Sequence, residues 1–161
     1  MNLIKLSSDL IKFKSVTPNS AGSLEFIEKI LKENKFNCHL LEFGDKKIKN
    51  LYAEIKGGKG PNLCFAGHTD VVPAGNLKDW TTNPFKPVIK NGVLYGRGAS
   101  DMKTAIAAFM HASLEFLSSC KNKFNGSLSF LLTADEEGEA DFGTKSMVNW
   151  LKKNTIKLTY V

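Results

Sequence analysis

The sequence has few of the features that mark an oxidising compartment. Its 161 residues include three cysteines, Cys38, Cys64 and Cys120, which lie far apart and form no Cys-x-x-Cys pair. An odd number of widely spaced cysteines argues against a disulfide framework and against a thiolate zinc knuckle. This pattern predicts a protein of a reducing compartment.

Long apolar runs are also missing. No window of the sequence is apolar over the length of a membrane span, and the N-terminus lacks a basic segment followed by a continuous apolar stretch. Both absences argue against a membrane segment and against a secretory leader. Together with the cysteine pattern, they predict a cytoplasmic protein with no membrane partner.

Arginine is nearly absent. The formal net charge is +6, but Arg97 is the single arginine and the lysines are spread along the chain without a dense run. Arginine is the residue that binds phosphate and guanine in bidentate fashion, so a lysine-dominated excess of this kind is typical of a solvated surface. We therefore predict no nucleic-acid partner.

What is present is an alternation of helix-like and strand-like segments. Apolar residues make up 42% of the chain, enough for one ordinary core and a single domain. Helical spacing predicts helices over 3–13, 24–31 and 102–117, and a last helix that Thr144 would cap, running to Trp150. Apolar runs between turn residues predict strands over 36–43, 51–55, 63–66, 92–96 and 128–133, and the opening of another over 156–161.

The runs 63–66 and 128–133 lack polar alternation, which is typical of strands buried on both faces of a largely parallel sheet. The glycine-rich segment 57–61 between strands lacks the spacing of a phosphate loop and predicts a plain turn. The predicted fold class is α/β, with a mostly parallel central sheet flanked by helices.

Three clusters of potential metal ligands adjoin these strands. They are Gly-His-Thr-Asp-Val-Val-Pro at 67–73, Gly-Ala-Ser-Asp-Met-Lys at 98–103 and Asp-Glu-Glu-Gly at 135–138. Open α/β sheets assemble their sites at strand ends. The pattern therefore predicts a two-metal hydrolase site.

The residue types fit that chemistry. His68 and Asp101 supply nitrogen and oxygen donors, and a carboxylate such as Asp101 can bridge two cations about 3.5 to 4 Å apart. Asp70, two residues from His68, is placed to accept the imidazole N–H and fix its tautomer. Glu136 and Glu137 cannot both point the same way in an extended backbone, which favours one as a ligand and the other as a proton carrier.

Each residue alone has a plainer interpretation. Asp101 could be a helix cap, His68 a hydrogen-bonded core histidine, and the acids at 135–137 surface charge. The joint pattern is much harder to dismiss than its parts.

The strings FAGHTDVVPAG, LYGRGASDMKTAIAAF and TADEEGEADFGT resemble the dinuclear zinc hydrolases of the M20 metallopeptidase family, and the resemblance covers nearly the whole chain. It implies a zinc aminopeptidase-like catalytic domain and two divalent metal ions, zinc or alternatively cobalt. It further implies that His68 ligates one ion, Asp101 bridges both, Glu137 ligates the other, Glu136 is the general base and acid, and Asp70 orients His68. A non-proline cis peptide at Asp101–Met102 is also implied.

Ala99, Ser100, the Asp-Glu-Glu-Gly tetrad and Gly143-Thr144 favour the members of that family that hydrolyse the amide of N-succinyl-LL-2,6-diaminopimelate to succinate and LL-2,6-diaminopimelate, a step of lysine biosynthesis. The substrate would then be a small molecule. The alternatives are another M20 deacylase, acting on acetylornithine or a dipeptide, and a non-catalytic metal-binding remnant.

Members of this family are much longer than 161 residues. The resemblance implies that residues 1–161 are the N-terminal part of a truncated catalytic domain. A second glutamate ligand, a lid and dimerisation domain and a C-terminal histidine ligand are then expected outside them. We expect the full-length parent to be a homodimer, and the 161-residue chain alone to be poorly folded or aggregating, with little activity.

Overall fold

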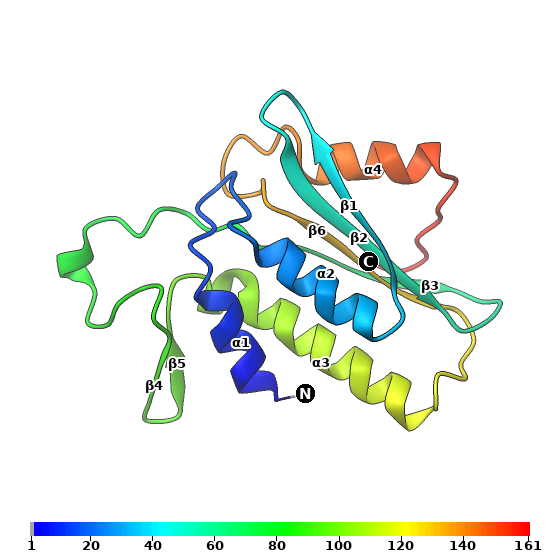
Figure 1. The fold of residues 1–161 in the computed structure, drawn as a ribbon, viewed down its shortest axis with the longest axis horizontal. Coiled ribbons are helices and arrows are strands. Elements are labelled where there is room, and N and C mark those ends of the chain that lie inside the picture. The colour runs from blue at the N-terminus through cyan, green and yellow to red at the C-terminus, as the bar shows by residue number, and fades with distance from the viewer. Residues whose placement is uncertain (1) are drawn as a thin grey trace.

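A computed structural model describes residues 2–161 as a four-stranded sheet with helices on both faces and an arm that projects from one end (Figure 1). Along the chain the elements are α1 (Leu3–Ile11), α2 (Ser23–Glu33), β1 (Asn37–Phe43), β2 (Ile48–Lys56), β3 (Asn62–His68), η1 (Leu77–Asp79), β4 (Val88–Lys90), β5 (Val93–Tyr95), η2 (Ala99–Lys103), α3 (Thr104–Ser119), β6 (Ser127–Thr133) and α4 (Thr144–Lys153).

The main sheet has the strand order β1-β2-β6-β3. The pairs β1–β2 and β2–β6 are antiparallel, and β3–β6 is parallel. The α/β class with flanking helices is confirmed, but the sheet is mixed rather than mostly parallel. A short turn joins β1 to its neighbour β2, whereas a parallel pair would need a crossover of a dozen or more residues. Strand β6 lies between β2 and β3 and runs parallel to β3 alone.

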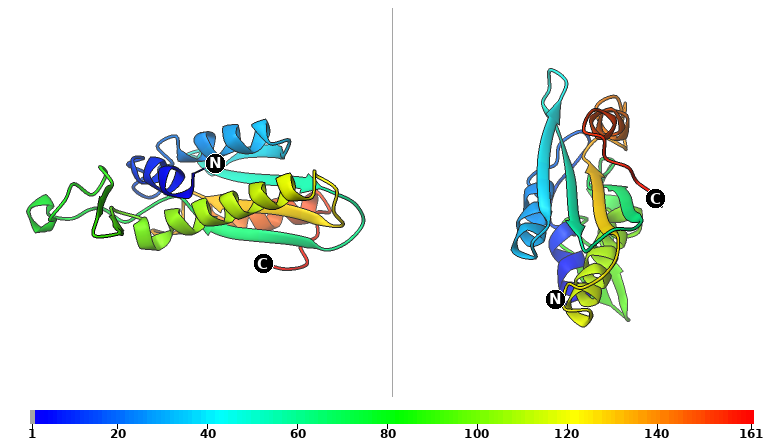
Figure 2. Two further views of the ribbon diagram at one scale, coloured as in Figure 1. Left: turned by 90° about the horizontal axis from the view of Figure 1, so that it is seen from below. Right: turned by 90° about the vertical axis from the view of Figure 1, so that its right-hand side faces the viewer.

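Helices α1, α2 and α3 cover one face of the sheet, and α4 covers the other (Figure 2). The apolar side chains of α2 that face the sheet, Leu24, Ile27 and Leu31, are completely buried. Phe130 of β6 lies at the centre of this larger core, with the rings of Phe36 and Phe109 at 5.7 and 5.2 Å. These contacts explain why the apolar periodicity predicts the helices well.

The second face is smaller. Met147 and Leu151 of α4 pack against Tyr52, Cys64 and Leu131. Helix α4 begins at Thr144, but the residue that precedes it as cap is Gly143 and no side-chain capping bond forms, so the predicted cap at Thr144 is wrong.

The arm contains η1 and the β4–β5 hairpin (Figure 1). Its turn residues Asn91 and Gly92 both have positive φ, 52° and 76°, as tight hairpin turns require. The strand expected over 92–96 is therefore one half of this hairpin.

The segment expected to open a further strand forms a single parallel bridge. Tyr160 pairs with Leu63, and the Tyr160 carbonyl accepts a hydrogen bond from Cys64 N at 2.9 Å. This single bridge does not cover β3. Leu63 remains 42% exposed, so the expectation that the run 63–66 is buried on both faces is wrong. In the described part of the chain, residues 2–161, no helix is both long and apolar enough to cross a membrane.

Candidate metal centre

His68 is the last residue of β3, where it lies opposite Thr133, the last residue of the parallel neighbour β6. The parallel pairing therefore brings the segments after both strands to one edge of the sheet. The imidazole is almost fully buried, and its Nε2 lies 3.0 Å from Asp101 Oδ1 and 3.6 Å from Glu136 Oε2.

Asp70 is completely buried behind His68. Its backbone carbonyl lies 3.1 Å from His68 Nδ1 and its carboxylate Oδ1 lies 3.6 Å away, so the carbonyl is the nearer partner. The other carboxylate oxygen accepts hydrogen bonds from the backbone N–H groups of Glu136 and Glu137, each at 3.0 Å. Asp70 thus contacts both sides of the cluster.

Asp101 lies in η2, where the backbone leaves helical geometry and the Asp101–Met102 peptide is cis, as the resemblance implied. It is three residues before α3 begins and does not cap that helix. The Asp101 side chain is 71% exposed toward solvent. The following side chain, Met102, packs close to Gly67, where a Cβ would lie 3.0 Å from Met102 Cε and from Phe65 Cε1.

Glu136 and Glu137 follow β6. One ligand atom each from His68, Glu136 and Glu137 lie within 4.8 Å of one another. Asp101 is not one of these three residues, but its Oδ1 contacts His68 Nε2. The structure therefore brings together all five residues expected at the site, and it places both glutamates close enough to hold an ion.

The charges of the cluster perturb one another. Burial lowers the pKa of His68, but the Asp70 carboxylate, the Asp70 backbone and Glu136 outweigh it and raise that pKa to about 9. Burial and the Asp101 carboxylate raise the pKa of Glu137. Against the effect of burial, hydrogen bonds from His68 and from the backbone of the two glutamates hold the pKa of Asp70 below its usual range.

This donor set fits a divalent cation. A carboxylate such as Glu137, whose pKa a neighbouring carboxylate raises, is stabilised by a positive ion, and imidazole with carboxylate oxygens suits zinc, cobalt or manganese. The spacing within 4.8 Å is compatible with ligands that share one ion or two neighbouring ions.

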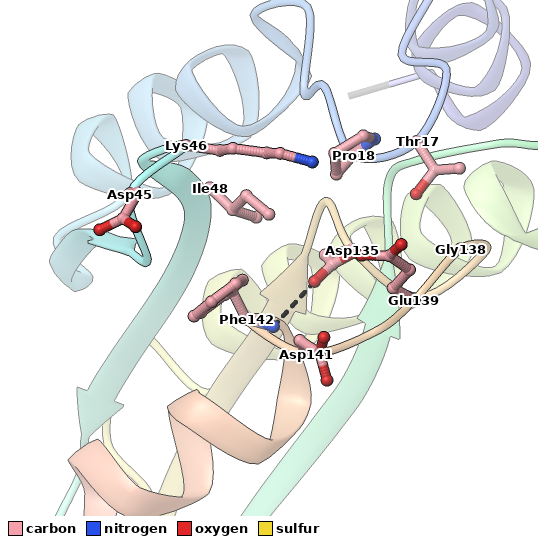
Figure 3. Close-up of a pocket in the computed structure, with 10 residues that line it drawn as sticks. All are labelled: Thr17, Pro18, Asp45, Lys46, Ile48, Asp135, Gly138, Glu139, Asp141 and Phe142. Atoms are coloured by element: carbon pink, nitrogen blue, oxygen red, sulfur yellow. Dashed lines mark hydrogen bonds between the residues drawn. The ribbon is translucent and has the colours of Figure 1, made fainter.

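A pocket of about 430 Å³ lies against the loop that carries Glu136 and Glu137, because Asp135 and Gly138 on either side of them line it. Figure 3 shows its lining residues. The pocket is lined by Thr17, Pro18, Asp45, Lys46, Ile48, Asp135, Gly138, Glu139, Asp141 and Phe142, and Figure 3 shows the Asp135 carboxylate accepting from Phe142 N at 2.8 Å. None of the five expected site residues lines it.

One supporting segment was missed by sequence reasoning. Residues 13–17 run along the end of β3, where Ser15 Oγ donates to the Thr69 carbonyl at 2.6 Å and Val71 N donates to the Ser15 carbonyl at 2.9 Å. The sequence signal there, Thr17-Pro18-Asn19, indicates only a turn.

Comparison with known proteins agrees with this geometry. Residues 64–161 match Peptidase family M20/M25/M40. The chain belongs to this family. Membership of a metallopeptidase family implies divalent metal ions.

Named relatives are similar over almost the whole chain. Succinyl-diaminopimelate desuccinylase of Wolbachia pipientis wMel is 49% identical over 98% of this chain, which covers 39% of that protein. The enzyme of the same name from Rickettsia prowazekii strain Madrid E is 49% identical over 94% of the chain, covering 40% of that protein. The M20 chain thus spans about two fifths of the length of these relatives.

Solved structures of family members share the fold. Human carnosine dipeptidase 1 superposes with a TM-score of 0.85 at 20% identity, covering 98% of this chain and 37% of that one. The M20 family metallo-carboxypeptidase Sso-CP2 from Sulfolobus solfataricus superposes with a TM-score of 0.79 at 25% identity, covering 99% of this chain and 36% of that one. The fold is therefore that of M20 peptidase catalytic domains.

Proposed function

We propose that residues 1–161 carry part of the two-metal centre of an amidohydrolase, and that the whole enzyme cleaves N-succinyl-LL-2,6-diaminopimelate to succinate and LL-2,6-diaminopimelate. The observation that carries the proposal is the convergence of His68, Glu136 and Glu137 within 4.8 Å at the end of β3. The substrate follows from the 49% identity to proteins named for that reaction.

In this proposal His68, Asp101 and Glu137 are the ligands of two divalent ions, zinc or alternatively cobalt. When bound, the ions supply Lewis acidity and make a water molecule a better nucleophile near neutral pH. Three ligand residues are few for two ions, so the remaining ligands would come from outside residues 1–161. The M20 chain would then be the N-terminal part of the catalytic domain, with the lid and dimerisation domain also outside it.

Glu136 is proposed as the general base and acid. Its side chain is 54% exposed and reaches the open side of the cluster, 3.6 Å from His68 Nε2. An exposed carboxylate at this edge can take a proton from water and return it to the leaving amine. The hydrogen bond from Glu136 N to Asp70 holds the backbone from which that side chain extends.

Asp70 is proposed to orient the imidazole. Because its carbonyl and carboxylate both lie against His68 Nδ1, a proton on Nδ1 is favoured and Nε2 is left free to ligate. The full-length protein is proposed to act on a small molecule as a cytoplasmic homodimer, without a nucleic-acid or membrane partner.

Zinc binding tests the centre directly. We expect a full-length protein in which residues 1–161 are continued as in the relatives to bind zinc in competition with a chromogenic chelator, and His68→Ala to weaken that binding at least tenfold. His111→Ala on α3 is the matched control, because it removes an imidazole outside the cluster. Equal affinity in wild type and His68→Ala would reject the metal centre and favour a non-catalytic remnant.

The two glutamates are separated by a second comparison. Glu137→Gln should lose zinc, whereas Glu136→Gln should keep it. In a full-length protein in which residues 1–161 are continued as in the relatives, Glu136→Gln should abolish turnover. Loss of zinc in Glu136→Gln alone would mean that the roles of the two residues are reversed.

A substrate panel tests the reaction. The full-length protein should hydrolyse N-succinyl-LL-2,6-diaminopimelate faster than acetylornithine or a dipeptide, and the 161-residue chain with added zinc should show little turnover. A preference for acetylornithine or a dipeptide would reassign the enzyme to another deacylase of the family.

A further inference from the structure

Lys103 is a buried lysine that no role described above uses. It is the last residue of η2, two positions after Asp101, and its side chain is completely buried. Its ammonium donates a hydrogen bond to the Phe13 carbonyl at 2.8 Å. Within residues 2–161 this is the single side-chain hydrogen bond of Lys103.

The turn that carries Asp101 closes around this lysine. Lys103 N donates to the Gly98 carbonyl at 2.9 Å. Gly98 has φ 80°, and a Cβ there would lie 3.0 Å from Lys103 Cδ and 2.8 Å from Val71 Cγ1. The aliphatic part of Lys103 therefore fills the inside of the turn, and the side chain leads from the turn to the Phe13 carbonyl.

The partner of Lys103 belongs to the segment that follows the end of β3. Residues 13–17 are joined to residues 69–71 by Ser15 Oγ to the Thr69 carbonyl, by Val71 N to the Ser15 carbonyl and by Thr17 N to the Val71 carbonyl at 3.1 Å. Through Phe13, Lys103 thus connects the turn of Asp101 to the stretch of chain that holds His68 and Asp70.

Packing alone does not require a lysine at this position. A buried ammonium is costly unless it is paired and hydrogen-bonded, and no carboxylate in the described chain forms an ion pair with this one. A methionine would fill nearly the same volume without that cost. The features that methionine could not reproduce are the bond to the Phe13 carbonyl and the positive charge, which interacts with the Asp70 carboxylate.

We propose that Lys103 is a positioning residue of the metal centre, whose bond to the Phe13 carbonyl holds the Asp101 turn against the end of β3. The 3.0 Å contact between Asp101 Oδ1 and His68 Nε2 is the arrangement that this tie maintains. Since Asp101 is mostly exposed and has no other side-chain partner among residues 2–161, its position is set by the backbone of the turn. The inference depends on the proposed metal centre.

The test compares metal binding in Lys103→Met and Lys103→Arg of a full-length protein in which residues 1–161 are continued as in the relatives. Lys103→Met keeps the packing and loses the bond, so we expect a tenfold or greater loss of zinc affinity with no fall in Tm. Lys103→Arg keeps a cationic donor, so we expect it to recover part of the lost affinity. Cobalt(II) loaded in place of zinc should show a changed visible absorption band in Lys103→Met, since that band reports the ligand geometry.

Met110→Ala is the matched control, because it empties a fully buried position on the adjoining helix α3. It should lower the Tm and leave zinc affinity and the cobalt spectrum unchanged. If Lys103→Met does not fold, Lys103→Gln, whose shorter side chain also loses the bond, is judged by the same criteria.

The inference would be overturned if Lys103→Met, or Lys103→Gln in its place, kept the zinc affinity and the cobalt spectrum of the wild type. It would also be overturned if Met110→Ala lost zinc affinity in proportion to its fall in Tm, as the Lys103 variant does. These outcomes differ from failure of the metal centre itself, in which wild type and His68→Ala already bind zinc equally.

Discussion

Asp70 is the residue at which most polar contacts of the site meet. It touches the imidazole of His68 with its carbonyl and carboxylate, and it accepts from the backbone of Glu136 and Glu137. One buried side chain therefore sets the position of a nitrogen donor and of two carboxylate donors. The spacing of His68 and Asp70 predicts the first contact, but nothing in the sequence indicates the second.

We predict that Asp70→Asn lowers zinc affinity about 10- to 100-fold, the usual cost of losing a partner that orients a ligand. Asp135→Asn is the matched control, since Asp135 is also a buried aspartate that accepts from a backbone N–H, that of Phe142, in the same loop. Chelator competition on both variants measures the difference. Equal affinities in the two variants would contradict the role given to Asp70.

Cys38 offers a pH-dependent prediction away from the metal centre. Burial, followed by the Glu28 carboxylate, raises the pKa of Cys38 to about 11, and the thiolate is the reactive form. Its alkylation rate should therefore rise about tenfold per pH unit from pH 7 to 10 and level off only near pH 11.

Mass spectrometry of iodoacetamide-treated protein gives that rate. In urea, where the chain is unfolded, the plateau should move down toward the ordinary thiol pKa of 9.0. A plateau near 9 in the folded protein would show that the thiol is not shielded by the fold.

At the scale of helices and strands, the register of β3 against β6 creates the site. Because the two strands are parallel and end together at His68 and Thr133, the loops that follow them emerge at one edge. Phe130 of β6 anchors this pair to helix α3 through its contact with Phe109, and it also packs against Phe36 in the connection between α2 and β1.

Phe130→Ala should destabilise the chain by about 3 to 5 kcal/mol, the range for emptying a buried aromatic position. That is a large share of the total for a domain of this size. Ile89→Ala on the projecting arm is the control, because Ile89 is largely exposed and its truncation should change stability by less than about 0.5 kcal/mol. Urea unfolding followed by circular dichroism compares the two, and similar midpoints would contradict the packing described here.

The elements were largely predictable from the sequence, but their pairing was not. Apolar periodicity locates the helices and the strands, because an element that buries one face must repeat its apolar residues with the period of that element. The continuous apolar run in β3 suggested burial on both faces, yet Leu63 is exposed. The short turn at 44–47 leaves no room for a crossover helix and could have predicted the antiparallel pair β1–β2. The insertion of β6 between β2 and β3 has no such signal in the turn at 57–61.

The candidate ligands were predictable for a different reason. Residues of metal-ligand type occur in three clusters, and each cluster adjoins the end of a predicted strand or helix. Since such ends meet at one edge of an α/β sheet, the sequence alone predicts that the clusters lie close together. The supporting contacts of Ser15 and Lys103 could not be predicted, because one partner in each is a backbone carbonyl distant in sequence.

At the scale of the whole molecule, the edge of β3 exposes a group of apolar side chains. Leu63 and Phe116 are 42% and 44% exposed beside an apolar groove of about 270 Å³, and Tyr160 next to them is 60% exposed. Exposed apolar edge strands favour association between copies of a chain.

We predict that the 161-residue chain self-associates as its concentration rises and that Leu63→Lys reduces this, because a charge on an edge strand opposes pairing. Sedimentation velocity over a range of concentrations measures it. Ile89→Lys on the arm controls for added charge alone. If both variants reduce association equally, the edge of β3 is not the surface responsible.

The shared carboxylate of Asp70 also restricts where this chain can change in length. Adding one residue between Ala134 and Glu136 would rotate the glutamate pair out of reach of its two backbone bonds and away from the imidazole at once. The projecting arm has no such bonds to the glutamate pair. Natural insertions and deletions among homologous sequences should accordingly collect between positions 74 and 96 and be missing from 134 to 137.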